Sequence, residues 1–119
     1  MTTILVGGVG KADVASRLKE LGEPDLEVTV TNDMDAAMTL RSGRADYFLG
    51  TCHTGAGGSL GVLVGLLGSG KCHTVGRGGG SAADFGAALD AGKVAFGFST
   101  DQAETVVPRF VQALRERRG

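Results

Sequence analysis

Apolar and polar positions along this chain switch repeatedly between two periodicities. Short runs rich in β-branched and other apolar residues predict five strands, at residues 3–6, 27–31, 47–51, 72–75 and 94–98. Each run is followed by a segment of mixed polarity that predicts a helix, at residues 12–21, 34–41, 59–67, 82–91 and 102–117. The pattern is therefore a strand followed by a helix, repeated five times.

Local signals mark several of the helix ends. Asn32 or Asp33 can start the second helix, and Ser81 with Asp84 has the spacing of a capping box at the start of the fourth. Pro108 lies inside the last helix, where it removes one backbone donor and should kink the helix or delay its start.

Strict alternation of strands and helices predicts a parallel sheet covered on both faces. We expect one α/β domain spanning residues 1–119, a three-layer flavodoxin-like (Rossmann-like) fold with a five-stranded sheet of order 2-1-3-4-5. In such sheets ligands bind outside the carboxyl ends of the strands, between strands 1 and 3. The sequence thereby predicts where a site should lie.

Glycine-rich loops follow both of those strands. The first runs through Gly8 and Gly10 to Lys11, and the second contains Gly55, Gly57, Gly58 and Ser59 at the start of the third predicted helix. Glycines allow close backbone approach, and N–H groups at a helix N-terminus favour anions. We predict an anion site there, with a tight packing turn as the simpler alternative for the second loop.

Two cations are expected near the same edge. Lys11 follows strand 1 and Arg77 follows strand 4, and charged hydrogen bonds from them would favour a phosphorylated or carboxylated small molecule. Either residue could instead be an ordinary solvated loop residue. Thr100 and Asp101 follow strand 5 at this edge as well.

Cys52 is the candidate for chemistry. A thiol close to a helix N-terminus can be activated as a nucleophile or proton-transfer group, although buried inert cysteines are common. His53 and His73 could tune the site or titrate near neutral pH. The paired Cys-His dipeptides at residues 52–53 and 72–73 suggest zinc, but neighbours on a strand point to opposite faces, so we predict no metal.

Composition excludes several classes of partner. Glycine accounts for 21 of 119 residues, about two and a half times the usual share, but without a collagen period or linker pattern. A formal charge of −1 argues against nucleic-acid binding, and the arginines near the end of the chain suit a helix C-terminus. Two cysteines without a disulfide framework, and no signal-peptide pattern in residues 1–10, indicate the cytoplasm.

Two motif-like stretches carry no function. Residues 47–70 hold no formal charge, but their eight glycines and polar side chains argue against a membrane span. Residues 65–71 spell most of a Walker A motif, yet they close a helix and enter a strand, the reverse of a phosphate-binding loop, so no cofactor is predicted. Gly57, Gly61 and Gly65 share one helix face and could pack against the sheet or a partner, for example in a homo-oligomer.

Several segments together resemble the YhfU-like family of small uncharacterised bacterial proteins over nearly the full length of the chain. The matching segments are residues 32–38, 42–43, 46–47, 52–57 and 92–97. The resemblance implies family membership and is silent on activity.

A second resemblance covers only the loop after strand 3. Cys52-His-Thr-Gly-Ala-Gly57 is similar to a segment of type B ribose-5-phosphate isomerases, in which the cysteine is a base, the threonine helps ring opening and the glycine loop stabilises an enediolate. The resemblance implies these roles for Cys52, Thr54, Gly55 and Gly57. The Asp-His segment that these isomerases place after strand 1 is absent, and Gly7-Gly-Val-Gly10 stands there instead.

Three function classes follow. The first is a protein that binds a small anionic metabolite, and the second is a sugar-phosphate isomerase-like enzyme that uses Cys52. The third is a subunit of a sugar transport or phosphotransfer system, which resembles cysteine-loop components of sugar phosphotransferases and implies a transporter partner. Those components carry the cysteine after their first strand, whereas Cys52 follows the third.

Overall fold

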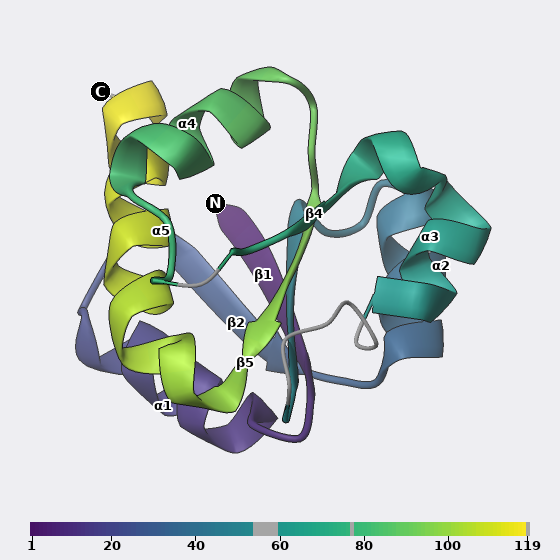
Figure 1. Cartoon of the computed structure of the whole chain (residues 1–119), viewed down its shortest axis with the longest axis horizontal. Coiled ribbons are helices and arrows are strands. Elements are labelled where there is room, and N and C mark those ends of the chain that lie inside the picture. The colour runs from purple at the N-terminus through teal and green to yellow at the C-terminus, as the bar shows by residue number, and fades with distance from the viewer. Residues whose placement is uncertain (54–59, 77, 119) are drawn as a thin grey trace.

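The computed structural model describes residues 1–53, 60–76 and 78–118. These residues form five strands and five α-helices in strict alternation (Figure 1). The strands are β1 (Thr2–Gly8), β2 (Leu26–Val30), β3 (Tyr47–Cys52), β4 (Cys72–Thr74) and β5 (Ala95–Ser99). The helices are α1 (Lys11–Glu20), α2 (Asp33–Arg41), α3 (Gly61–Leu67), α4 (Ala82–Asp90) and α5 (Ala103–Arg118). Each lies within a few residues of the segment that the hydrophobic pattern predicts.

The sheet is parallel throughout, but its order is β2-β1-β3-β5-β4. The predicted order 2-1-3-4-5 is therefore wrong at the last two positions. All five residues of β5 are buried, whereas only Cys72 of the three residues of β4 is. A central strand is covered on both faces and needs apolar or small residues throughout, so β5 lies inside and the short, polar β4 lies at the edge.

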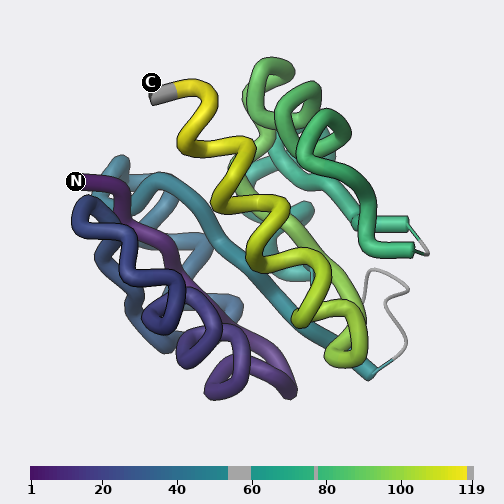
Figure 2. Tube along the Cα trace, turned by 90° about the vertical axis from the view of Figure 1, so that its left-hand side faces the viewer, coloured from purple at the N-terminus to yellow at the C-terminus, as the bar shows by residue number. Residues whose placement is uncertain are grey.

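The exchange of β4 and β5 moves one helix to the other face of the sheet. Right-handed crossovers require that α4, which connects the edge strand back to an inner one, lies on the opposite face from α3. Helices α1, α4 and α5 therefore cover one face and α2 and α3 cover the other (Figures 1 and 2). The helix that follows β3 and the helix that follows the adjacent β5 therefore lie on opposite faces of the sheet.

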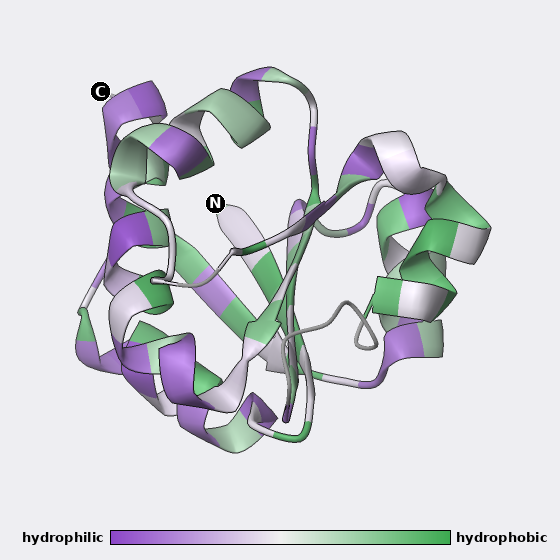
Figure 3. Cartoon of the chain, in the orientation of Figure 1, coloured by the Kyte–Doolittle hydropathy of each residue, from purple (hydrophilic) through white to green (hydrophobic). Residues whose placement is uncertain are grey.

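Each face of the sheet has its own apolar core. The larger core joins Phe85, Phe96, Phe98 and Phe110, with the rings of Phe96 and Phe110 5.0 Å apart. The smaller one, under α2 and α3, is centred on Phe48 and includes leucines from β1 and from the start of α3. Figure 3 shows the strands between two layers of helices, with α1, α4 and α5 on one side and α2 and α3 on the other.

Most of the predicted helix ends are found. Ser81 and Asp84 form the capping box of α4, and Asn32 caps α2 by accepting a hydrogen bond from the Asp35 N–H at 2.8 Å. Helix α5 starts at Ala103, one residue later than predicted, and continues through Pro108, which supplies no N–H for the Glu104 carbonyl.

One predicted packing contact is absent. A Cβ placed on Gly61 or on Gly65 would meet nothing within 4 Å, so neither glycine packs against the sheet. The buried residues Leu60 and Leu63 make that contact instead. No helix in the described part of the chain has the length and apolar character to cross a bilayer.

Candidate functional site

The carboxyl end of β1 turns tightly against β3 at Gly8. Gly8 has a φ of +90°, and a Cβ at this position would lie 2.0 Å from the Thr51 carbonyl oxygen. The Val9 N–H donates to that same oxygen at 3.2 Å. Only glycine fits here, because both the backbone angle and the space exclude a side chain.

Thr51 holds the loop after β1 in place. Its side chain is buried, and its Oγ1 accepts the Gly10 N–H at 2.7 Å and donates to the Gly7 carbonyl at 3.3 Å. A Cβ on Gly10 would lie 3.1 Å from the same Oγ1. The sequence analysis missed this role, since a threonine inside an apolar strand reads as an ordinary strand residue.

A pocket of about 530 Å³ opens to solvent at the carboxyl ends of β2, β1 and β3. We call it the edge pocket. Its lining residues are Gly8, Val9, Lys11, Thr31, Asn32, Asp33, Met34, Thr51 and Cys52. This volume is typical of sites for small molecules.

The edge pocket brings together three of the residues that the sequence singles out, Gly8, Lys11 and Cys52. Gly10 is not a lining residue, but its N–H donates to the side chain of Thr51, which is one. His53 is exposed and does not belong to the lining. The other predicted ligand-binding and catalytic residues, Thr54, Gly55, Gly57, Gly58, Ser59 and Arg77, lie outside the described residues.

Asp33 is the member of the pocket that the sequence analysis treated only as a possible helix start. Its Oδ1 is shielded from solvent and has no hydrogen-bond partner, the one such side-chain atom found in the described part of the chain. Burial raises the pKa of the Asp33 carboxyl, and the charge of Lys11 offsets this only in part. The signal available in the sequence was position alone, since Asp33 lies three residues after the carboxyl end of β2.

Cys52 ends β3 and is half-buried in the same pocket. Its thiol lies 3.9 Å from the Phe98 carbonyl oxygen of β5, at the limit of a weak S–H hydrogen bond. Helix α3 begins at Gly61 rather than at the predicted Ser59, with Leu60 as its N-cap. Residues 54–59, between Cys52 and that helix, lie outside the described residues. The activation of Cys52 by the helix N-terminus therefore stays a prediction.

The corrected strand order changes the neighbours of this site. Because β5 lies between β3 and β4, Cys52 pairs in register with Ser99, and Thr100 follows beside the Gly10 loop. The loop after β4 is one strand further from the edge pocket than the predicted order implied. Arg109 and Gln102 anchor that loop by donating to the carbonyls of Gly80 and Gly76.

His73 lies away from the edge pocket as well. It lines a second cavity of about 450 Å³ beside β4, with its ring edge-on to Phe96 at 5.8 Å. Burial, and then the nearby charge of Lys93, lower the pKa of His73, which Asp84 partly counteracts. His73 therefore does not tune the edge pocket by direct contact.

Together these features define a Rossmann-like α/β protein whose strand ends form an open, ligand-sized pocket. The family model described as "Protein of unknown function DUF2620" matches residues 2–114, and the chain belongs to this family. It is 34% identical over 117 residues to the uncharacterised protein YhfU of Escherichia coli strain K12, which covers 97% of this chain and all of the relative. YhfU of Shigella flexneri matches to the same extent. The resemblance to the YhfU-like family is thereby confirmed.

A solved structure shares the fold. The crystal structure of ribose-5-phosphate isomerase B from Giardia lamblia matches with a TM-score of 0.63 and 20% identity, covering 93% of this chain and 94% of that one. At this identity the likeness concerns the arrangement of strands and helices.

Proposed function

We propose that this protein binds a small phosphorylated or carboxylated metabolite of the cytoplasm in the edge pocket. The observation that carries the proposal is the position of Lys11, which is exposed, lines the pocket and is the first residue of α1. The ten-residue helix presents its positive end at the same place.

The start of α1 has room for an anion. Its N-cap, Gly10, supplies no side-chain acceptor for the first-turn N–H groups, and Asp13 in that turn pairs with Arg17 at 2.9 Å instead. Lys11 forms no ion pair with any other residue that the structure describes. A bound phosphate or carboxylate would receive backbone N–H bonds and one charged hydrogen bond. The glycine loop at residues 55–58 with Ser59 remains a predicted second source of N–H donors.

Titration with inorganic phosphate and with acetate, followed by calorimetry, tests the proposal. Lys11→Ala should weaken the binding of either probe about tenfold, the effect of losing one charged hydrogen bond. Lys19→Ala is the matched control, because Lys19 is exposed in the last turn of the same helix. If neither probe binds the unaltered protein at millimolar concentration, the proposal is wrong.

A second candidate function is favoured by Cys52, the thiol in the same pocket. In an isomerase-like enzyme Cys52 would act as the base that removes a proton from carbon, with Thr54 assisting ring opening and His53 tuning the thiol. The solved isomerase B supports this candidate at the level of fold. The loop Gly7–Gly10 lacks the acid-base residues that such isomerases place after the first strand.

Turnover of ribose 5-phosphate, followed by NMR, tests the second candidate. Activity in the unaltered protein that is lost in Cys52→Ser and kept in Cys72→Ser would establish an enzyme, since Cys72 lies on β4 outside the pocket. Absence of turnover at high protein concentration would leave the binding function alone. The third hypothesis, a phosphotransfer subunit, stays a prediction that no observation favours.

A further inference from the structure

The carboxyl of Asp33 is not required by the fold around it. Helix α2 is already capped by Asn32, whose side chain accepts the Asp35 N–H and donates to the Asp35 carboxylate at 2.9 Å. Among the described residues, no hydrogen bond reaches either oxygen of Asp33. A buried polar atom without a partner costs free energy, so the fold itself gains nothing from a carboxyl group at this position.

The surroundings of Asp33 explain why its buried oxygen stays unpaired. A Cβ on Gly7 would lie 3.4 Å from Asp33 Oδ1 and 2.9 Å from Cε1 of Phe48, so Oδ1 lies close to a glycine and an aromatic ring. Neither offers a side-chain donor. Asp33 as a residue is nevertheless only half-buried and lines the edge pocket, so its other oxygen is the one that a ligand would reach.

We infer that Asp33 is the group of the edge pocket that recognises hydroxyl groups on the bound anion, so that the ligand class is a small hydroxylated anion. This inference rests on the proposed function. Lys11 would hold the anionic group of the ligand, and Asp33 would accept hydrogen bonds from its hydroxyls. The ligand thereby supplies the donors that the protein withholds from this carboxylate.

The geometry suits a ligand with two different ends. Asp33 follows β2, Lys11 follows β1 and Cys52 ends β3, and these are three adjacent strands. Adjacent strands are about 4.8 Å apart, so the pocket extends about 10 Å across three strand ends. Lys11 and Asp33 follow neighbouring strands and form no ion pair with each other, so one ligand can contact both side chains at once.

The charge of Lys11 also selects between the possible donors. A ligand ammonium group at Asp33 would meet the field of Lys11, which is close enough to act on the Asp33 carboxyl. A neutral hydroxyl meets no such repulsion. An anion without any donor, such as sulfate, would be repelled by Asp33 and gain nothing from it.

The test compares sulfate, ribose 5-phosphate and 2-aminoethyl phosphate on three proteins, by calorimetry at pH 7.5. The unaltered protein should bind ribose 5-phosphate at least about tenfold more tightly than the other two ions, because a charged acceptor adds this much to a hydroxyl contact. Asp33→Asn should lose most of that preference and bind sulfate as well or better. Asp25→Asn is the matched control, since exposed Asp25 precedes β2 at the opposite end of the same strand.

The outcomes separate the inference from the proposed function. A preference for ribose 5-phosphate that survives in Asp33→Asn, or its absence from the unaltered protein, overturns the role of Asp33 while anion binding stands. A preference for 2-aminoethyl phosphate overturns the assignment of hydroxyl groups. If none of the three ions binds, the proposed function fails and the inference fails with it. Thermal unfolding confirms that Asp33→Asn is folded, and Asp33→Ala repeats the test without the amide.

Discussion

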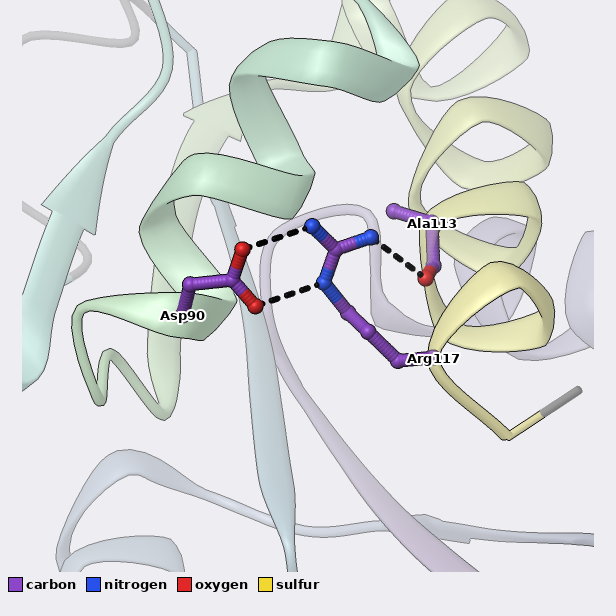
Figure 4. A network of polar contacts seen from close by, with 3 residues as sticks. All are labelled: Asp90, Ala113 and Arg117. Carbon is purple, nitrogen blue, oxygen red and sulfur yellow. Dashed lines mark hydrogen bonds and ion pairs between the residues drawn. The ribbon is translucent and has the colours of Figure 1, made fainter.

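Two carboxyl groups at helix ends differ in whether a neighbouring side chain binds them. Asp90 lies at the last position of α4, where the helix dipole disfavours a negative charge, yet Arg117 of α5 binds it through two hydrogen bonds of 3.0 and 2.9 Å (Figure 4). Asp33 lies at the first position of α2, where the dipole favours it, yet no residue that the structure describes donates to it. Whether a carboxyl group is paired therefore depends on the side chains that the tertiary structure brings next to it, more than on its position along the helix.

The pKa directions follow the same division. Hydrogen bonds from Arg117 hold the pKa of Asp90 below its ordinary value, whereas burial raises that of Asp33. The Arg117 side chain also donates to the Ala113 carbonyl and lies over Gly86. The polar groups of Arg117 and Asp90 are thus paired within the contact between α4 and α5. In the edge pocket, by contrast, no residue that the structure describes donates a hydrogen bond to the Asp33 carboxyl.

The largest effect is expected from the turn that shapes the edge pocket. Gly8→Ala should lower the free energy of unfolding by more than about 3 kcal/mol, because the new methyl group collides with the Thr51 carbonyl in a backbone conformation strained for alanine. Urea unfolding measures this. Gly43→Ala is the control, with a φ of +78° but open space, and should cost only about 1 kcal/mol. Equal losses would show that the close approach to β3 is unimportant.

The two cysteines sharpen the contrast between the pocket and the core. Cys52 should react with iodoacetamide at least about tenfold faster than Cys72, because Cys52 is half-buried in an open pocket while Cys72 is buried. Burial also raises the pKa of the Cys72 thiol. Mass spectrometry of the alkylated peptides gives both rates, and phosphate should protect Cys52. Similar rates for the two thiols would contradict the accessible pocket.

A smaller effect with an informative sign is expected at Asp33. Asp33→Asn should stabilise the protein at neutral pH by less than about 1 kcal/mol, a modest amount because the carboxyl is only partly buried and water screens it. The native pKa is raised, so the ionised group costs stability above that pKa and the cost disappears as the pH falls through it. The gain should therefore vanish in acid. Destabilisation at neutral pH would mean that Asp33 has a structural partner.

The smallest effect is expected at Asp90, with the opposite sign. Asp90→Asn should lower the melting temperature slightly at neutral pH, because it removes a carboxylate whose native pKa is held low by Arg117. That contribution is present above the pKa of the unfolded chain and is lost as the pH falls through the native value. Added salt should reduce the difference, since both side chains are solvated. A change as large as that of Gly8→Ala would show that the ion pair is far stronger than its exposure allows.

The sequence by itself determined the alternation of strands and helices, the caps at Asn32 and Ser81, and the glycine-rich turn after β1 at the carboxyl edge of the sheet. These signals depend on residues only a few positions apart, so they can be read along the chain. The order of β4 and β5, the clamp of Thr51 on Gly10 and the unpaired oxygen of Asp33 were decided only by the tertiary structure. Each depends on which distant segments become neighbours, because strand order follows burial on both faces and a hydrogen bond such as that from Gly10 to Thr51 joins residues forty-one positions apart.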